Sequence, residues 1–192
     1  MRRLLVLLLP LAVALTACRT TPRVTDTAAG FRAAVAEFAS RPTLAAGSAE
    51  ERAAIARFEG FLANITAAKA RAQTTNVYAP DCFFNDTLKT LRGSANVRDY
   101  FAATAENSES VTAAFDDATR SGDGLYYFRW VMDTRLKKIA KGQTIRTLGI
   151  TVVRFDEQGR VLLHQDYWDS AVGLWDHVPV IGYGIRAIKA RL

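Results

Sequence analysis

Residues 144–169 read TIRTLGITVVRFDEQGRVLLHQDYWD, and this stretch decides the fold class. The segments 144–155 and 160–169 are rich in β-branched and aromatic residues, a composition that is typical of strands. Between them, Asp156-Glu157-Gln158-Gly159 forms a cluster of turn residues. The sequence therefore predicts an antiparallel hairpin.

Two preceding segments extend this hairpin into a larger sheet. Residues 110–119 and 125–137 also alternate or carry runs of β-branched and aromatic side chains, and Ser121-Gly122-Asp123-Gly124 separates them as a second turn. Turn clusters at this spacing predict a meander of antiparallel strands from residue 110 to residue 169.

Helices are predicted ahead of the meander. Apolar residues recur at helical spacing from Ile55 to Ile65, which predicts one long amphipathic helix that begins near Glu50 and ends before Tyr78. A short strand is expected over residues 82–86, and a second helix is expected after Gly93 with Ser94 as its N-cap. This order of elements predicts an α+β fold with the helices gathered on one face of a curved sheet.

The N-terminal segment has the parts of a secretory signal. Arg2 and Arg3 precede an apolar core that is shorter than the about 20 residues needed to cross a bilayer. The motif LTAC at residues 15–18 resembles a bacterial lipobox, which implies removal of residues 1–17 and acylation of Cys18. The resemblance implies a lipoprotein on the periplasmic side of the cell envelope, and Arg19 favours the outer membrane. A plain signal peptide with a chance cysteine is the alternative.

Composition divides the rest of the chain into three parts. Residues 18–49 are rich in Thr, Ala, Ser and Pro and are predicted to be a tether with a short helix near residues 28–38. Residues 50–170 are predicted to be the folded domain, and residues 171–192 a helical tail. The formal net charge of +6 comes without a long basic run, so nucleic acid is not an expected partner.

The predicted tail carries an apolar face with basic residues off it. Two interpretations stay open: the tail lies on a membrane surface, or it covers apolar surface of the domain. The face consists of Ile181, Ile185, Ile188 and Leu192.

Cysteine and histidine usage argues against metal and cofactor chemistry. If Cys18 is acylated, Cys82 has no partner within the chain, and its neighbours Phe83 and Phe84 indicate a buried thiol. The two histidines and the scattered acids show no metal-ligand spacing, and the chain has neither a phosphate-binding loop nor a nucleophile elbow. No metal and no cofactor is therefore expected.

Three motifs together resemble the nuclear transport factor 2-like superfamily, especially its SnoaL-like branch. They are YAPDCFFND at residues 78–86, Gly93 leading to DYF at residues 99–101, and the run from Gly149 to HQDYWD at residues 164–169. The resemblance implies a cone-shaped α+β domain in which a curved antiparallel sheet, with helices packed on its concave face, encloses an apolar pocket. Its members include isomerases, cyclases, epoxide hydrolases and binders, so the fold alone does not fix the function.

The last strand is where the resemblance places chemistry. Side chains alternate along a strand, so His164, Asp166 and Trp168 share one face. The run HQDYWD is similar to a strand of limonene epoxide hydrolases, and the general base of that strand would fall on Asp166. Asn85 matches an asparagine that helps to hold the attacking water. A structural carboxylate at Asp166 and a satisfied, partly buried histidine at His164 are the alternatives.

Aromatic side chains suggest how a pocket would be lined. Trp130 and Met132 align with an Arg-x-Asp pair of the epoxide hydrolases, and Phe83 replaces their tyrosine, which argues against unmodified epoxide hydrolysis. Core packing is the alternative to a pocket for each of these side chains. The expected lining consists of Phe83, Tyr126, Phe128, Trp130, Met132 and Trp168.

Three classes of function follow from these observations. The leading hypothesis is a lipid-anchored protein that binds a hydrophobic small molecule. The second is a hydrolase, isomerase or cyclase with Asp166 as general base. The third is a protein-interaction module, since the superfamily often forms homodimers through the outer face of the sheet. The expected partners are a membrane, through Cys18, a small molecule and a second copy of the chain.

Overall fold

The computed structural model describes Asp26 and residues 28–192. The lipobox-like motif with Cys18 and most of the first half of the predicted tether lie outside the described residues. The chain divides into two units between Arg32 and Ala33, and the unit Ala33–Leu192 carries the sheet and the core. Among the described residues, no helix combines the length and the apolar character needed to span a bilayer.

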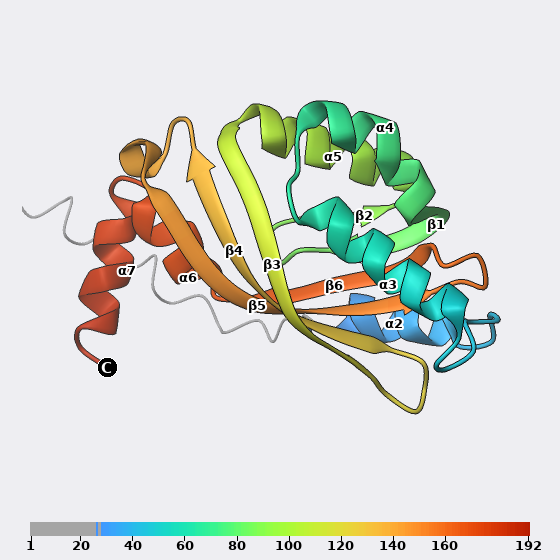
Figure 1. Cartoon of the computed structure of the whole chain (residues 1–192). Helices are drawn as coiled ribbons and strands as arrows, with labels where there is room; N and C mark the ends of the chain where they lie inside the picture. The colour runs from blue at the N-terminus through green and yellow to red at the C-terminus, as the bar shows by residue number, and fades with distance from the viewer. Residues whose placement is uncertain (1–25, 27) are drawn as a thin grey trace, which may run out of the picture. The chain divides into compact units, whose positions relative to one another are not determined.

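A curved sheet of six strands forms the body of this unit (Figure 1). The strands lie in the order β2-β1-β6-β5-β4-β3, in which β3 to β6 form the predicted antiparallel meander and β1 runs parallel to β6. Their bounds are β1 Tyr78–Asn85, β2 Thr90–Arg92, β3 Ser108–Arg120, β4 Tyr126–Leu136, β5 Thr144–Phe155 and β6 Val161–Trp168.

The β5–β6 turn forms where the sequence predicts it. Oδ1 of Asp156 accepts hydrogen bonds from the backbone N–H groups of Gln158 and Arg160. Gly159 has a φ of 73°, a conformation that glycine adopts without steric cost, and a Cβ there would lie 2.9 Å from Cβ of Ala54. Local turn chemistry therefore fixes this hairpin, and with it the register of β6.

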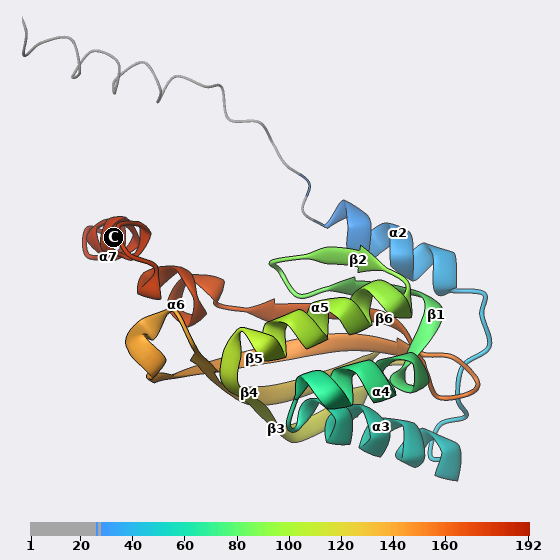
Figure 2. The same ribbon diagram turned by 90° about the horizontal axis from the view of Figure 1, so that it is seen from above.

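Three helices cover the concave face of the sheet: α3 (Ala49–Leu62), α4 (Ala67–Val77) and α5 (Ser94–Glu106) (Figure 2). The prediction of one long first helix is wrong, because the helix ends at Leu62 and a second helix begins at Ala67. Thr66 caps α4 through its side chain, and the N–H of Ile65 donates to the carbonyl of Val111 on β3 instead of to a helix.

The start of α5 differs from the prediction by one residue. Gly93, not Ser94, occupies the N-cap position, and no side chain caps this helix. Gly93 has a φ of 82°, and a Cβ at this position would lie 3.0 Å from the carbonyl oxygen of Pro80. Gly93 therefore marks the start of α5 in the sequence, because its backbone conformation favours glycine.

The second half of the predicted tether packs onto the domain. Helix α2 (Ala29–Phe38) ends at Phe38, whose side chain is fully buried, and Glu37 forms an ion pair with Arg92. The guanidinium of Arg154 donates to the carbonyls of Ala39 and Arg41. These contacts make the residues from Ala33 onward part of the folded unit.

The C-terminal tail consists of α6 (Ser170–Gly173), a 3-10 turn η2 (Trp175–His177) and α7 (Ile181–Lys189). Asp169 caps α6 by accepting hydrogen bonds from the backbone N–H groups of Ala171 and Val172. Helix α7 lies beyond the end of the sheet that is opposite the β5–β6 turn (Figures 1 and 2).

Candidate functional site

A cavity of about 170 Å³ lies between the concave face of the sheet and the helices. An apolar cavity of about 150 Å³ is large enough to take benzene, so this one can hold a ring-sized ligand. Its walls come from α3, α5, β1, the four strands of the meander, and the C-terminal end of α6 with Gly173 and Leu174.

Most of the lining is apolar. The side chains come from elements that are far apart in the sequence and that the curvature of the sheet brings together. The main apolar groups are Leu62, Ile65, Phe84, Phe101, Val111 and Phe115, and Trp130, Met132 and Trp168 join them from β4 and β6.

A hydrogen-bonded chain ends on the carboxylate of Asp166 at the cavity wall. Nε1 of Trp130 donates to Oγ1 of Thr151 at 2.8 Å, and this hydroxyl donates to Oδ1 of Asp166 at 2.5 Å. Nε2 of His164 lies 2.9 Å from the same oxygen, and Nδ1 lies 3.1 Å from the hydroxyl of Tyr78. If Tyr78 donates to Nδ1, then Nε2 carries the proton and donates to Asp166.

The two donors converge on one oxygen of Asp166. Oδ2 has no hydrogen-bond partner among the described residues, and the side chain of Asp166 is 14% exposed. One oxygen is therefore held by the protein, while the other remains available to a bound molecule. This geometry fits a general base whose orientation is fixed by its neighbours.

A second carboxylate, Asp86, lies in the same cavity just beyond the end of β1. Its Oδ2 accepts a hydrogen bond from the hydroxyl of Tyr100, and its Oδ1 accepts from the backbone N–H groups of Leu88 and Lys89. Burial raises the pKa of Asp86, and the negative charge of Asp166 raises it further, although the hydrogen bond from Tyr100 opposes both.

Burial also raises the pKa of Tyr100, and the adjacent Asp86 charge adds to this effect. Tyr100 therefore stays protonated and acts as a hydrogen-bond donor. Two carboxylates in one apolar cavity, each with its own donors, form the kind of pair that can divide the roles of acid and base. The arrangement is suited to moving a proton on a bound molecule.

The structure brings Asp166 and His164 together, but it places Asn85 elsewhere. Oδ1 of Asn85 accepts from Nε2 of Gln165 at 2.9 Å, and its amide donates to Oγ1 of Thr90. Asn85 does not line the cavity, because alternation along β1 turns Phe84 and the following Asp86 inward. Asn85 instead joins β1 to its two neighbouring strands.

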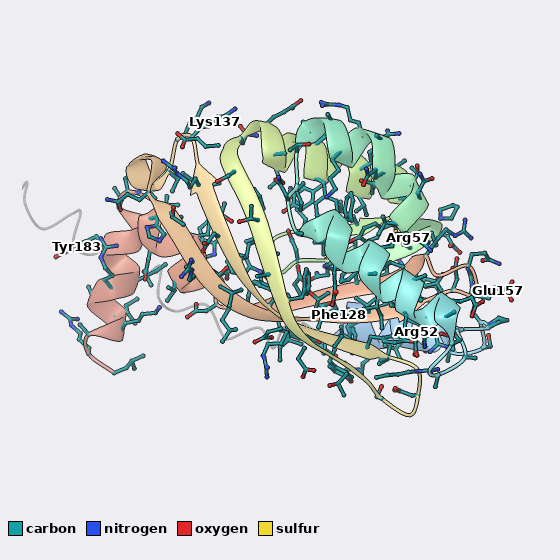
Figure 3. All side chains as sticks on the ribbon, in the orientation of Figure 1. Arg52, Arg57, Phe128, Lys137, Glu157 and Tyr183 are labelled. Carbon is teal, nitrogen blue, oxygen red and sulfur yellow. The ribbon has the colours of Figure 1, made fainter. Side chains whose placement is uncertain are left out.

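The predicted aromatic lining divides into two groups. Trp130, Met132 and Trp168 line the cavity, whereas Tyr126, Phe128 and Phe83 do not. These residues of β4 share one face of the strand. That face lies in the closed core at Tyr126 and Phe128 and reaches the cavity at Trp130 and Met132. Figure 3 shows Phe128 below α3, where its ring centroid lies 4.8 Å from that of Phe58.

Tyr126 and Phe83 have other partners. The hydroxyl of Tyr126 donates to Oε1 of buried Glu51 at 2.6 Å, which ties β4 to α3. Phe83 faces the opposite side of β1, where the guanidinium of Arg92 lies 5.1 Å from its ring centroid. Both aromatics therefore stabilise the framework around the cavity.

Asp86, Tyr100 and Thr151 are site residues that sequence reasoning missed. Asp86 lies two positions after Phe84 and shares its face, but the sequence does not show which face of β1 turns inward. Thr151 could have been found as the residue that pairs with Asp166 in the β5–β6 register. Tyr100 is an inward residue of a helix, and its contact with Asp86 depends on tertiary packing.

No metal centre is formed by the part of the chain that the structure describes, since no group of three or more His, Cys, Asp or Glu side chains is suitably placed. Cys82 is fully buried, as its apolar neighbours predict, and burial raises the pKa of its thiol to about 12. A thiol in this state is not a nucleophile at neutral pH.

The fold is shared with several solved structures of low sequence identity. TsrD from Streptomyces laurentii has 17% identity and a TM-score of 0.55, covering 69% of this chain and 97% of its own. An LEH-like epoxide hydrolase from M. tuberculosis has 12% identity and a TM-score of 0.52, and the match covers 74% of this chain and 97% of the hydrolase chain. The Δ5-3-ketosteroid isomerase from Mycobacterium sp. has 13% identity and a TM-score of 0.51, and the match covers 65% of this chain and 97% of the isomerase chain.

No curated protein sequence matches the chain significantly. The sequence pattern of the SnoaL-like domain matches residues 58–164, which is more than half of the chain. The matched region contains α5, most of the cavity and all of the sheet except the end of β6. The chain therefore belongs to the family of SnoaL-like domains.

Proposed function

We propose that this protein binds a hydrophobic small molecule in the cavity of its SnoaL-like domain. The observation that carries the proposal is the cavity itself, which is lined mainly by apolar side chains and has the carboxylates of Asp86 and Asp166 at its wall. Apolar walls provide affinity, and a few fixed polar groups provide orientation, which is the usual composition of a small-molecule site.

Native mass spectrometry of the chain from Thr20, purified without detergent, tests this proposal. A discrete extra mass that is lost on denaturation would support it and would identify the ligand class. The variant Ala113→Phe fills the cavity, whereas Ala114→Phe adds the same ring to an exposed position of β3. Loss of the extra mass in the first variant only would assign the ligand to the cavity, and equal retention in both would contradict the proposal.

A proton-transfer enzyme is the second candidate, and the two carboxylates favour it. Asp166 would act as general base through Oδ2, while burial raises the pKa of Asp86, which favours its role as the acid of the pair. The neighbours named as an isomerase and an epoxide hydrolase share only the fold with this chain.

Once a ligand is known, Asp166→Asn separates the enzyme from the binder. In an enzyme the rate should fall by about 10²–10⁴-fold, the contribution of general base catalysis, while ligand affinity is retained. Unchanged turnover would remove Asp166 as the base. His164→Gln would then report whether the imidazole acts only by holding the carboxylate.

We propose further that Cys18 is acylated and holds the domain at the periplasmic side of the bacterial envelope, preferentially at the outer membrane. The signal-like segment and the motif LTAC support this. More than one acyl chain gives durable anchoring. Cys18→Ala should move the protein from the membrane fraction to the soluble periplasmic fraction, and unchanged fractionation would contradict the proposal.

Exposed apolar residues on the convex face of the sheet favour a homodimer. Leu148 is 63% exposed, Ile150 is 42% exposed and Tyr127 is 40% exposed, and they lie on adjacent strands β5 and β4. Light scattering of the chain from Thr20 would report a dimer, and Ile150→Lys should dissociate it. A strict monomer would contradict this proposal.

A further inference from the structure

Helix α7 is oriented against the usual rule for amphipathic helices. A surface helix normally turns its apolar side toward the protein. Here the side that contacts η2 carries Gly182, Arg186 and Lys189. A Cβ on Gly182 would lie 2.1 Å from the carbonyl oxygen of Asp176, so the helix approaches η2 closely along this side.

The apolar side of α7 is largely exposed. At about 3.6 residues per turn, Ile181, Ile185, Ile188 and Leu192 fall on one side of the helix. Ile181 is 49% exposed, Ile188 is 64% exposed and Leu192 is fully exposed. Tyr183, 75% exposed, projects from a different side of α7 (Figure 3).

Basic side chains flank this apolar side. Lys189 and Arg191 lie to either side of the isoleucines at helical spacing. The tail from residue 170 carries three basic residues, Arg186, Lys189 and Arg191, and one acid, Asp176, which lies 3.8 Å from Nζ of Lys189. Among the described residues, Arg186 and Arg191 form no ion pair, and Arg186 donates only to a backbone carbonyl.

We propose that α7 docks on an anionic membrane surface, with its isoleucine side among the acyl chains and its basic side chains at the headgroups. An apolar stripe bordered by cations is complementary to such a surface, because long basic side chains reach the headgroups while the stripe is buried. Acylation of Cys18 is not required for this contact.

Docking of α7 would bring one wall of the cavity to the membrane. Gly173 and Leu174 line the cavity, and they belong to the segment that leads directly into η2 and α7. A cavity at this position is suited to a ligand that partitions into the bilayer. This choice of ligand class rests on the proposed function, whereas the docking of α7 does not.

Vesicle sedimentation tests the docking directly. The chain from Thr20 lacks Cys18 and keeps the whole compact unit Ala33–Leu192. It should bind vesicles made from equal parts of phosphatidylcholine and phosphatidylglycerol, and it should bind phosphatidylcholine vesicles much more weakly. Lys189→Gln and Arg191→Gln should each weaken the anionic binding by about fivefold.

Two matched variants separate the apolar contact from charge. Ile188→Glu places an acid on the apolar side, and Ala190→Glu makes the same charge change on the opposite, exposed side. Binding should fall at least about tenfold further in the first variant, since burial of one isoleucine is worth about that factor or more. Both positions are exposed, so circular dichroism should show an intact fold in both.

Absence of binding to the anionic vesicles would overturn the proposal. Equal losses in the two glutamate variants would also overturn it, since the isoleucine side would then not be buried. A dimer that Ile188→Glu dissociates, together with no vesicle binding, would assign this side to a second copy of the chain. None of these outcomes depends on whether the cavity binds a ligand.

Discussion

Nε1 of Trp130 donates a hydrogen bond of 2.8 Å to the hydroxyl of Thr151, and the indole reaches this hydroxyl by lying across Gly149. Trp130 pairs with Gly149 in the β4–β5 register. A Cβ on Gly149 would lie 2.2 Å from the indole ring. The glycine thus allows a large aromatic to line the cavity and to position Thr151, which in turn holds Asp166.

Gly149→Ala should therefore displace the indole of Trp130 and lower the free energy of unfolding. Forcing an extra group into a packed site costs about 1–3 kcal/mol, and urea denaturation measures this change. Gly60→Ala is the matched control, because a Cβ there meets nothing within 4 Å in helix α3. The control should gain up to about 1 kcal/mol, and equal effects of the two substitutions would contradict the packing argument.

Thr151→Val should destabilise the protein at almost constant volume. The valine cannot accept from Trp130 or donate to Asp166, and a buried polar group left without its partner costs about 1–3 kcal/mol. Thr151→Ser keeps the hydroxyl and should recover most of this loss. Urea denaturation of both variants measures the difference, and a valine variant as stable as the serine variant would show that the hydroxyl is dispensable.

Local signals explain why much of the fold was predictable. The turn around Asp156 and Gly159 depends on contacts within five residues, so the sequence alone locates the hairpin and the strand that carries Asp166 and His164. The break between α3 and α4 was missed, because it depends on the bond from Ile65 to Val111, a residue that is distant in sequence.

The polar residues at the cavity wall could be predicted from the sequence only in part. Phe83 and Phe84 are both buried, and the guanidinium of Arg92 lies over the rings of Phe83 and Phe38. Composition alone therefore does not show which face of β1 turns inward. The choice between Asn85 and Asp86 could not be made without this information. The contact between Asp86 and Tyr100 also depends on how α5 packs over the strand end.

Phe38→Ala should cost about 3–5 kcal/mol of unfolding free energy, the range for truncating a buried phenylalanine. The side chain is fully buried, although it belongs to a segment whose composition suggests a tether. Tyr183→Ala removes an aromatic that is 75% exposed and should change stability by less than about 0.5 kcal/mol. Thermal unfolding of both variants measures this, and a small effect at Phe38 would mean that the α2 region is detached from the domain.

The contribution of Asp86 to the free energy of unfolding should decrease as the pH rises through its titration. Burial raises the pKa of this carboxyl above the ordinary value of 3.8, so the folded chain holds the proton more tightly than the unfolded chain. The stabilising contribution of the protonated form is complete below the unfolded pKa and is lost as the pH passes the folded pKa. Asp86→Asn keeps an oxygen for the N–H groups of Leu88 and Lys89 and removes the charge.

The difference in unfolding free energy between Asp86→Asn and the parent chain should therefore shift in favour of the variant as the pH rises above 3.8. Urea denaturation at a series of pH values measures this shift. Asp81→Asn provides the opposite case, because the ion pair with Arg41 lowers the pKa of Asp81. The parent chain should gain stability over that variant as the pH rises through the acidic range. Parallel pH profiles for the two variants would show that the cavity does not desolvate Asp86.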